Sequence, residues 1–201
     1  PRRSGRGLFY CREHVAMDNF DETGWSIETR LVRGGLARSD FNETSEALYL
    51  TSGYVYRTAE EAERAFKQEI DRFIYSRFGN PTVAMFERRL ALIERAESCR
   101  ALASGMAAVF ASLACQLSAG DRLVASRALF GSCRYVCGEL LPRFGIHVEF
   151  VDGSDLRQWE VALAQPAQAV FLETPSNPGL ELIDLEAVTS LAHRAGALVV
   201  V

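Results

Sequence analysis

The chain has 201 residues, of which 48% are hydrophobic and 24% charged, a composition typical of a globular protein and unlike that of a disordered, collagenous or coiled-coil chain. The 22 basic and 26 acidic residues give a formal net charge of −4, so charge offers no argument for a nucleic-acid or membrane partner and favours a small-molecule ligand. Only one of the basic residues, Lys67, is a lysine.

The five cysteines are an odd number spread through apolar segments, which indicates reduced thiols in a cytoplasmic protein rather than a disulfide framework. Cysteines and histidines show no zinc-ligand spacing, so we expect no metal. The first residues lack the apolar run of an export signal, and no membrane-spanning stretch follows. Because the first methionine is Met17, we expect residues 1–28 to be a tail of upstream or disordered sequence.

Residues 29–80 predict an arm followed by a helix. The stretch 29–57 shows no clear hydrophobic period, so we expect it to be extended. Thr58 and Glu61 then form a capping box that begins a helix. The apolar face of this helix consists of Ala59, Ala62, Phe66, Ile70 and Phe73. After Pro81, we expect Thr82 to be the N-cap of a second helix.

From residue 81 onward the hydrophobic pattern alternates between helical periods and short apolar runs. The predicted strands are 100–103, 122–125, 147–151, 169–173 and 197–201, and the predicted helices between them are 104–120, 132–143, 156–164 and 184–195. This alternation predicts an α/β fold with a mostly parallel sheet and helices on both faces. The sequence ends inside a β-branched run, so we expect residues 81–201 to be the first part of an α/β domain, cut within a strand.

Ligands of open α/β sheets bind at the carboxyl ends of the strands, so the loops there are candidate sites. In Ser104-Gly105-Met106, a glycine at a strand-to-helix junction lets backbone N–H groups approach a phosphate, although tight strand–helix packing explains the glycine equally well. The sequence has neither the glycine fingerprint of dinucleotide sites nor a P-loop, which argues against nicotinamide and nucleoside triphosphate ligands.

Four further side chains could complete such a site. Asn177 lies between two prolines and could hydrogen-bond one ligand atom, or the segment could be a plain turn. Arg77 and Tyr75 could bind a phosphate, or could belong to a solvated loop. Phe130 offers an aromatic face, or a ring of the core. Together with the glycine turn, these residues provide the phosphate donors, aromatic plate and polar anchor that a planar phosphorylated cofactor requires.

Three segments resemble the signature loops of the Cys/Met-metabolism family of pyridoxal-phosphate (PLP) enzymes, in matching order and spacing over residues 29–201. These segments are Tyr75–Thr82, Ala103–Ala108 and Glu173–Pro178. The resemblance implies that the α/β domain is the truncated large domain of a type I PLP transferase fold. It also implies a homo-oligomer, expected to be a tetramer built of dimers with shared sites.

The resemblance assigns roles to single residues. Ser104, Gly105 and Met106 belong to the turn that holds the cofactor phosphate, with the backbone of Gly105 and Met106 as donors. Phe130 stacks on the pyridine ring, and Asn177 hydrogen-bonds its phenolic oxygen. The implied second group comes from a neighbouring subunit and consists of the phosphate contacts Tyr75 and Arg77 and the substrate-site residues Tyr56 and Arg57.

The segments Leu48–Phe66 and Leu129–Cys133 most resemble the family members that make homocysteine from O-succinylhomoserine, or the O-acetyl ester, and sulfide by γ-replacement. Cystathionine γ-synthase and γ-lyase activities remain alternatives, as does a non-catalytic phosphate-binding or interaction module. The family also needs an aspartate against the pyridine nitrogen and a lysine that binds the cofactor, both expected beyond Val201. Lys67 lies on an amphipathic helix, so we expect no catalytic residue within these 201 residues and no activity from them alone.

Overall fold

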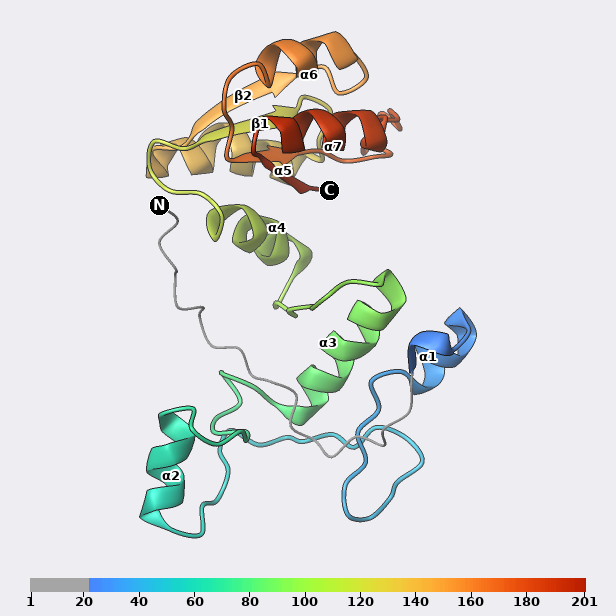
Figure 1. The fold of residues 1–201 in the computed structure, drawn as a ribbon, viewed down its shortest axis with the longest axis vertical. Helices are drawn as coiled ribbons and strands as arrows, with labels where there is room; N and C mark the ends of the chain where they lie inside the picture. The colour runs from blue at the N-terminus through green and yellow to red at the C-terminus, as the bar shows by residue number, and fades with distance from the viewer. Residues whose placement is uncertain (1–21) are drawn as a thin grey trace. The chain divides into compact units, whose positions relative to one another are not determined.

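The computed structural model describes residues 22–201 and separates into two compact units, which divide between Ala101 and Leu102 (Figure 1). The elements of unit 1 are η1 (Glu22–Gly24), α1 (Ile27–Arg33), α2 (Ala59–Phe66) and α3 (Pro81–Glu94). The elements of unit 2 are α4 (Gly105–Ala114), β1 (Arg122–Ser126), α5 (Gly131–Tyr135), η2 (Val136–Leu140), η3 (Leu141–Phe144), β2 (His147–Val151), α6 (Leu156–Ala162), β3 (Ala169–Phe171), α7 (Leu185–Arg194) and β4 (Leu198–Val200). No helix of residues 22–201 is long and apolar enough to cross a bilayer.

Unit 2 contains a parallel four-stranded sheet in the order β2-β1-β3-β4. The chain runs outward from β1 to β2 and then crosses to β3 on the other side of β1, so the strand order reverses between β1 and β3. Ligands of open parallel sheets bind at the carboxyl edge of such a reversal point. This topology confirms the predicted α/β class and selects the ends of β1 and β3 as the place to look for a site.

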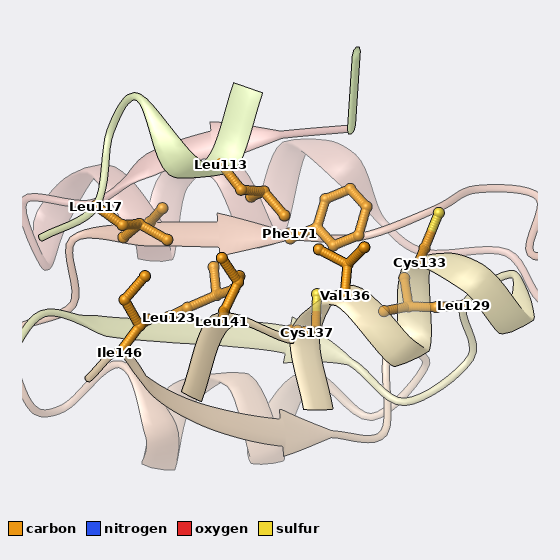
Figure 2. Packing of buried hydrophobic residues seen from close by; sticks show 12 residues of the cluster. Leu113, Leu117, Leu123, Leu129, Cys133, Val136, Cys137, Leu141, Ile146 and Phe171 are labelled. Carbon is orange, nitrogen blue, oxygen red and sulfur yellow. The ribbon is translucent and has the colours of Figure 1, made fainter. Parts of the chain in front are cut away.

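Helices cover both faces of the sheet because alternate strand residues are apolar on each face. On one face Leu123 and Phe171 pack with Leu113 of α4 and with the segment α5–η3 (Figure 2). On the other face Val124 and Val170 pack against α6 and α7, where Trp159 is fully buried. These two clusters make unit 2 a three-layer structure whose strands are held at fixed positions.

Among residues 22–101, the described part of unit 1, the apolar core is much smaller. Its buried cluster comprises Leu36, Ala37 and Met85, with Tyr49 packed against them. Buried Glu22 adds a polar connection, because its carboxylate accepts hydrogen bonds from Gly35 N–H at 3.1 Å and from Arg88 at 2.8 Å.

Several predicted element boundaries in unit 1 are wrong. The arm is not wholly extended, because residues 29–33 lie in α1, whose N-cap is Ser26. Helix α2 ends at Phe66, and Gln68 then adopts a positive φ of 60°, so Ile70 and Phe73 of the predicted apolar face lie outside the helix. Helix α3 is capped by Asn80, whose side chain accepts from Thr82 N–H, while Pro81 occupies the first helical position.

Two predictions around α4 are also wrong. Residues 100–103 form no strand, because Ala101 N–H binds the Glu87 carboxylate at 2.8 Å and residues 22–201 provide no neighbouring strand for that segment. Helix α4 ends at Ala114, well before Gly120, and a turn closed by Asp121 follows, in which the Asp121 carboxylate accepts from Ser118 N–H at 2.7 Å.

Candidate functional site

The carboxyl edge at the reversal point brings together the loops that follow β1 and β3. Phe130 lies at the end of the first loop, and its backbone N–H donates a hydrogen bond of 2.9 Å to the carboxylate of Glu173, two residues beyond β3. Leu129 is buried in the core, whereas Phe130 is 43% exposed. The loop therefore presents an aromatic ring at the edge of the sheet rather than in the core.

Helix α4 begins at this same edge, because it runs in the opposite direction to the strand β1 that follows it (Figure 1). The Ser104 side chain caps it by accepting from Ala107 N–H at 3.1 Å. Among the described residues no hydrogen bond engages the N–H groups of Gly105 and Met106, and no atom lies within 4 Å of the position of a Cβ on Gly105. The helix start thus offers unobstructed donors to an anion.

The loop that carries Asn177 is fixed by side chains on either side of it. Buried Ser176 accepts from Glu181 N–H through its hydroxyl at 3.0 Å, and Thr174 accepts from Ile183 N–H at 3.0 Å. Asn177 itself is exposed. The Asn177 amide therefore lies on a loop whose backbone is fixed by hydrogen bonds. The neighbouring Ser176 is buried, whereas Asn177 faces solvent.

Two thiols lie behind this edge. Cys133 is buried and hydrogen-bonds to Glu173, and burial followed by that carboxylate raises the pKa of the Cys133 thiol to about 11. Burial raises the pKa of Cys137, one turn later, to about 12. Both side chains stay protonated near neutral pH and act as core residues rather than nucleophiles.

Tyr75 and Arg77 lie in a turn of unit 1. Ser76 ties the turn to the arm, because its N–H donates to the Ser52 carbonyl at 2.9 Å. The guanidinium carbon of Arg77 lies 5.1 Å from the centre of the Tyr75 ring, and no ion pair among residues 22–201 involves Arg77. Arg77 also lines a hollow of about 880 Å³ formed with α3 and residues 97–101. This arginine is positioned by aromatic contact and exposed to solvent.

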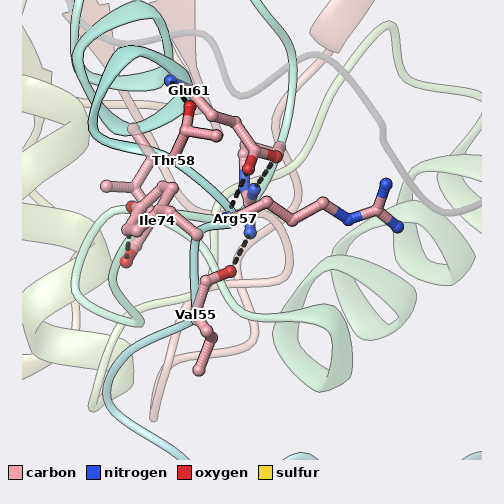
Figure 3. A network of polar contacts seen from close by, with 7 residues as sticks. Val55, Arg57, Thr58, Glu61 and Ile74 are labelled. Atoms are coloured by element: carbon pink, nitrogen blue, oxygen red, sulfur yellow. Dashed lines mark hydrogen bonds and ion pairs between the residues drawn. The ribbon is translucent and has the colours of Figure 1, made fainter.

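Tyr56 and Arg57 lie at the start of α2, in the network of Figure 3. The Arg57 N–H donates to Glu61 at 2.7 Å, and this bond, with the nearby charges of Arg72 and Arg57, holds the pKa of the Glu61 carboxyl below its ordinary value. Arg72 stacks over the Tyr56 ring at 4.4 Å. The side chain of Arg57 extends away from this network (Figure 3). The predicted capping box therefore forms only in part: Thr58 accepts from Glu61 N–H at 3.1 Å, but the Glu61 carboxylate accepts from Arg57 N–H and not from the N–H of Thr58.

The predicted residues fall into two groups, one in each unit. Unit 2 contains Ser104, Gly105, Met106, Phe130 and Asn177, whereas Tyr56, Arg57, Tyr75 and Arg77 belong to unit 1. The donors, ring and amide of unit 2 fit PLP, since its phosphate needs unengaged N–H groups and its pyridine ring needs an exposed aromatic face. Lys67 is exposed and pairs with Glu63 on α2 at 2.5 Å.

Residues 28–201 match the family described as Cys/Met metabolism PLP-dependent enzyme. The chain belongs to this family. Relatives from the family include O-succinylhomoserine sulfhydrylases of Mycobacterium tuberculosis, 63% identical over 88% of this chain, and of Pseudomonas aeruginosa, 42% identical over 90%. An L-methionine gamma-lyase of Fusobacterium nucleatum is 36% identical over 84% of this chain. The chain spans 44%, 45% and 43% of these relatives, so it covers less than half the length of each.

Solved structures of the Cys/Met-metabolism family share the fold. An O-acetylhomoserine (thiol)-lyase structure from Campylobacter jejuni, which contains N'-pyridoxyl-lysine-5'-monophosphate, superposes with a TM-score of 0.81 at 28% identity over 87% of this chain and 43% of its own. A cystathionine gamma-lyase from Lactobacillus plantarum, complexed with L-serine, gives 0.75 at 31% identity over 87% and 44%. These findings confirm the family resemblance and its dependence on PLP.

Sequence reasoning missed the contact made by Glu173. The residue was part of a recognised motif but had no assigned function, whereas the structure shows that it connects the loops after β1 and β3. A carboxylate directly after a buried strand, at the edge where a second strand ends, was the available signal. Thr174 and Ser176 were missed in the same way, because hydroxyl contacts to backbone within a loop leave no periodic pattern.

Proposed function

We propose that this chain is part of a PLP-dependent sulfhydrylase of methionine biosynthesis. The enzyme would form homocysteine by γ-replacement, with sulfide displacing the acyl group of O-succinylhomoserine or O-acetylhomoserine. PLP binding is supported by the carboxyl edge of the sheet, where a hydrogen bond joins the loops that carry Phe130 and Asn177. It is also supported by α4, which begins with unengaged N–H donors and whose Met106 packs against the same cluster as Leu129. The substrate is supported by the sulfhydrylase that is 63% identical to this chain.

In this proposal the residues of unit 2 bind and orient PLP. Gly105 and Met106 donate their N–H groups to the phosphate, and Ser104 keeps the first turn of α4 open for it by capping Ala107. Phe130 lies against the pyridine ring, and Asn177 donates to the phenolic oxygen. When bound, PLP supplies an electron-withdrawing ring that makes the α and β protons of an amino-acid substrate easier to move.

The residues of unit 1 serve a neighbouring subunit in this proposal. Tyr75 and Arg77 reach the phosphate of the partner's site, where the stacked guanidinium offers paired donors. Tyr56 and Arg57 face its substrate, for which the extended, positively charged Arg57 suits a carboxylate. The small buried core of unit 1 supports assembly with other copies, which we propose form a cytoplasmic homotetramer of dimers.

We further propose that the lysine that binds PLP, and the aspartate that faces its pyridine nitrogen, lie outside these 201 residues. Lys67 is unsuited to the role, because it is exposed and already paired with Glu63. The 201 residues alone should therefore show no turnover with PLP, O-succinylhomoserine and sulfide.

The full-length protein tests the function directly. It should bind PLP and convert O-succinylhomoserine and sulfide to homocysteine, identified by mass spectrometry. Cystathionine formed faster from cysteine would assign a γ-synthase instead, and release of a keto acid without added nucleophile would assign a γ-lyase. Failure to bind PLP would overturn the proposal and leave a non-catalytic module.

A further inference from the structure

A single carboxylate joins the two loops that carry the aromatic ring and the amide. Glu173 follows Leu172, which is fully buried and whose N–H continues the sheet by donating to the Val200 carbonyl at 3.1 Å. The backbone next to Glu173 is therefore fixed by the core. From this position its carboxylate accepts the Phe130 N–H at 2.9 Å, across 43 residues of sequence.

Among the described residues, the Phe130 N–H has no hydrogen-bond acceptor other than Glu173. Phe130 occupies the N-cap position of α5, where no side chain of the loop caps the helix. Leu129 before it and Cys133 after it are buried in the core, so the backbone is fixed on either side of Phe130. The bond to Glu173 fixes the backbone at Phe130 itself. With the N–H directed at Glu173, the ring is left on the exposed side of the loop.

We propose that Glu173 is a positioning residue for PLP, which holds the Phe130 ring in the plane that the pyridine ring needs. The proposal rests on the proposed function, because it presumes that PLP binds against Phe130. In this role Glu173 acts on cofactor binding through Phe130.

The test measures PLP affinity and visible circular dichroism of bound PLP in the full-length protein. Glu173→Ala should weaken PLP binding on the order of tenfold, the effect of losing one hydrogen bond to a charged group, and should change the dichroism band. Glu173→Gln keeps an acceptor for the Phe130 N–H and should restore most of both signals. Glu160→Ala removes an exposed carboxylate of α6 and should match the wild type.

A double-mutant cycle separates this role from a general effect on the fold. In the Phe130→Ala background, Glu173→Ala should cause no further loss of affinity, because the carboxylate acts through the ring. Cys133→Ala removes the thiol that also contacts Glu173 and should retain affinity. Additive losses in the cycle, or an equal loss in Cys133→Ala, would mean that the carboxylate only supports the core and would overturn the inference.

The two proposals fail in different ways. A wild-type protein that does not bind PLP removes the proposed function. If the wild type binds PLP and Glu173→Ala binds it equally well with an unchanged dichroism band, the positioning role alone is wrong.

Discussion

Cys137 shows how burial alone changes the chemistry of one side chain. It is fully buried, and desolvation is the largest cause of its pKa of about 12. A thiol whose pKa is higher in the folded state than its ordinary value of 9.0 binds its proton more tightly when folded. Its contribution to stability is therefore complete below about pH 9 and is lost as the pH rises toward 12.

We expect the free energy of unfolding to fall between pH 9 and pH 11 more steeply in the wild type than in Cys137→Ala. The reason is that the variant has no thiol at this position to ionise on unfolding. Denaturant titrations at several pH values measure both slopes, and only the slopes matter, since the variant also loses packing. Equal slopes would show that Cys137 does not titrate differently in the folded state.

Arg77 is a second residue whose side chain alone should change a measurable property, the affinity for PLP. We expect Arg77→Ala to weaken PLP binding by about 1.5–3 kcal/mol, the value of a hydrogen bond to a charged group, and Arg77→Lys to recover part of it. Lysine keeps the charge but lacks the planar pair of donors. Fluorescence titration of the full-length protein with PLP measures the affinities, and unchanged binding in Arg77→Ala would remove this residue from the proposed site.

In unit 2, the link between β2 and α6 is tightly packed around Gly153. A Cβ on Gly153 would lie 2.5 Å from the Ser126 hydroxyl and 2.6 Å from a methyl carbon of Ile183. The carbonyl of Gly153 also accepts from the indole of buried Trp159 at 3.0 Å. A methyl group added at Gly153 would therefore clash with Ser126 and Ile183, and the bond to Trp159 keeps the turn from shifting to relieve the clash.

We expect Gly153→Ala to destabilise the protein by about 1–3 kcal/mol, the usual effect of overpacking a core. Gly138→Ala is the matched control, because the nearest atoms to its Cβ would be ring carbons of Phe150 at an ordinary 3.8 Å. Thermal or urea unfolding measures both. A Gly153→Ala protein as stable as the control would show that β2 and α6 shift freely.

At this same scale, the sequence predicts the elements of unit 2 well, except for the end of α4, and the ends of those in unit 1 poorly. The predicted 147–151 strand is β2, because apolar strand patterns and turn residues report a local preference. Asn80 and Thr82 show what local patterns miss. Thr82 is a good N-cap by type, but its hydroxyl accepts from Tyr49 N–H at 2.8 Å and leaves the cap to Asn80. Such choices depend on residues far away in sequence.

The residues of the candidate site also differ in how well the sequence predicts them. Gly105, Phe130 and Asn177 could be proposed from the sequence because they lie at the start of a predicted helix or in loops beside predicted elements. The position of Glu173 at the end of a predicted strand was also a signal, but its contact could not be predicted, since the partner is a backbone N–H 43 residues earlier.

Across the whole molecule, the two units differ in how much apolar surface they bury. Unit 2 has two core clusters, whereas the described residues of unit 1 form one small cluster. Large apolar side chains stay exposed on both units, among them Phe41 and Leu50 of unit 1 and Val161 and Leu180 of unit 2. A protein with so many exposed apolar side chains is expected to associate. This agrees with the proposed sharing of sites between subunits.

Mixed oligomers test that sharing. We expect full-length Arg77→Ala and Asn177→Ala proteins to have little activity separately at limiting PLP, and to recover about a quarter of wild-type activity when unfolded and refolded together in equal amounts, because half of the sites in each mixed pair contain neither change. Refolding each variant alone is the control. No recovery in the mixture would mean that both residues serve the same subunit's cofactor.

The single lysine of the chain has a practical use that follows from its place on α2. Lys67 is exposed, and the remaining basic side chains are arginines, which do not react with amine-directed reagents such as succinimidyl esters. On these 201 residues, one dye or cross-linker can therefore be attached to the end of α2, with the α-amino group as the other reactive amine. Borohydride trapping of pyridoxal on these 201 residues likewise has only those two amines to modify, so a peptide map would reveal adventitious labelling at once.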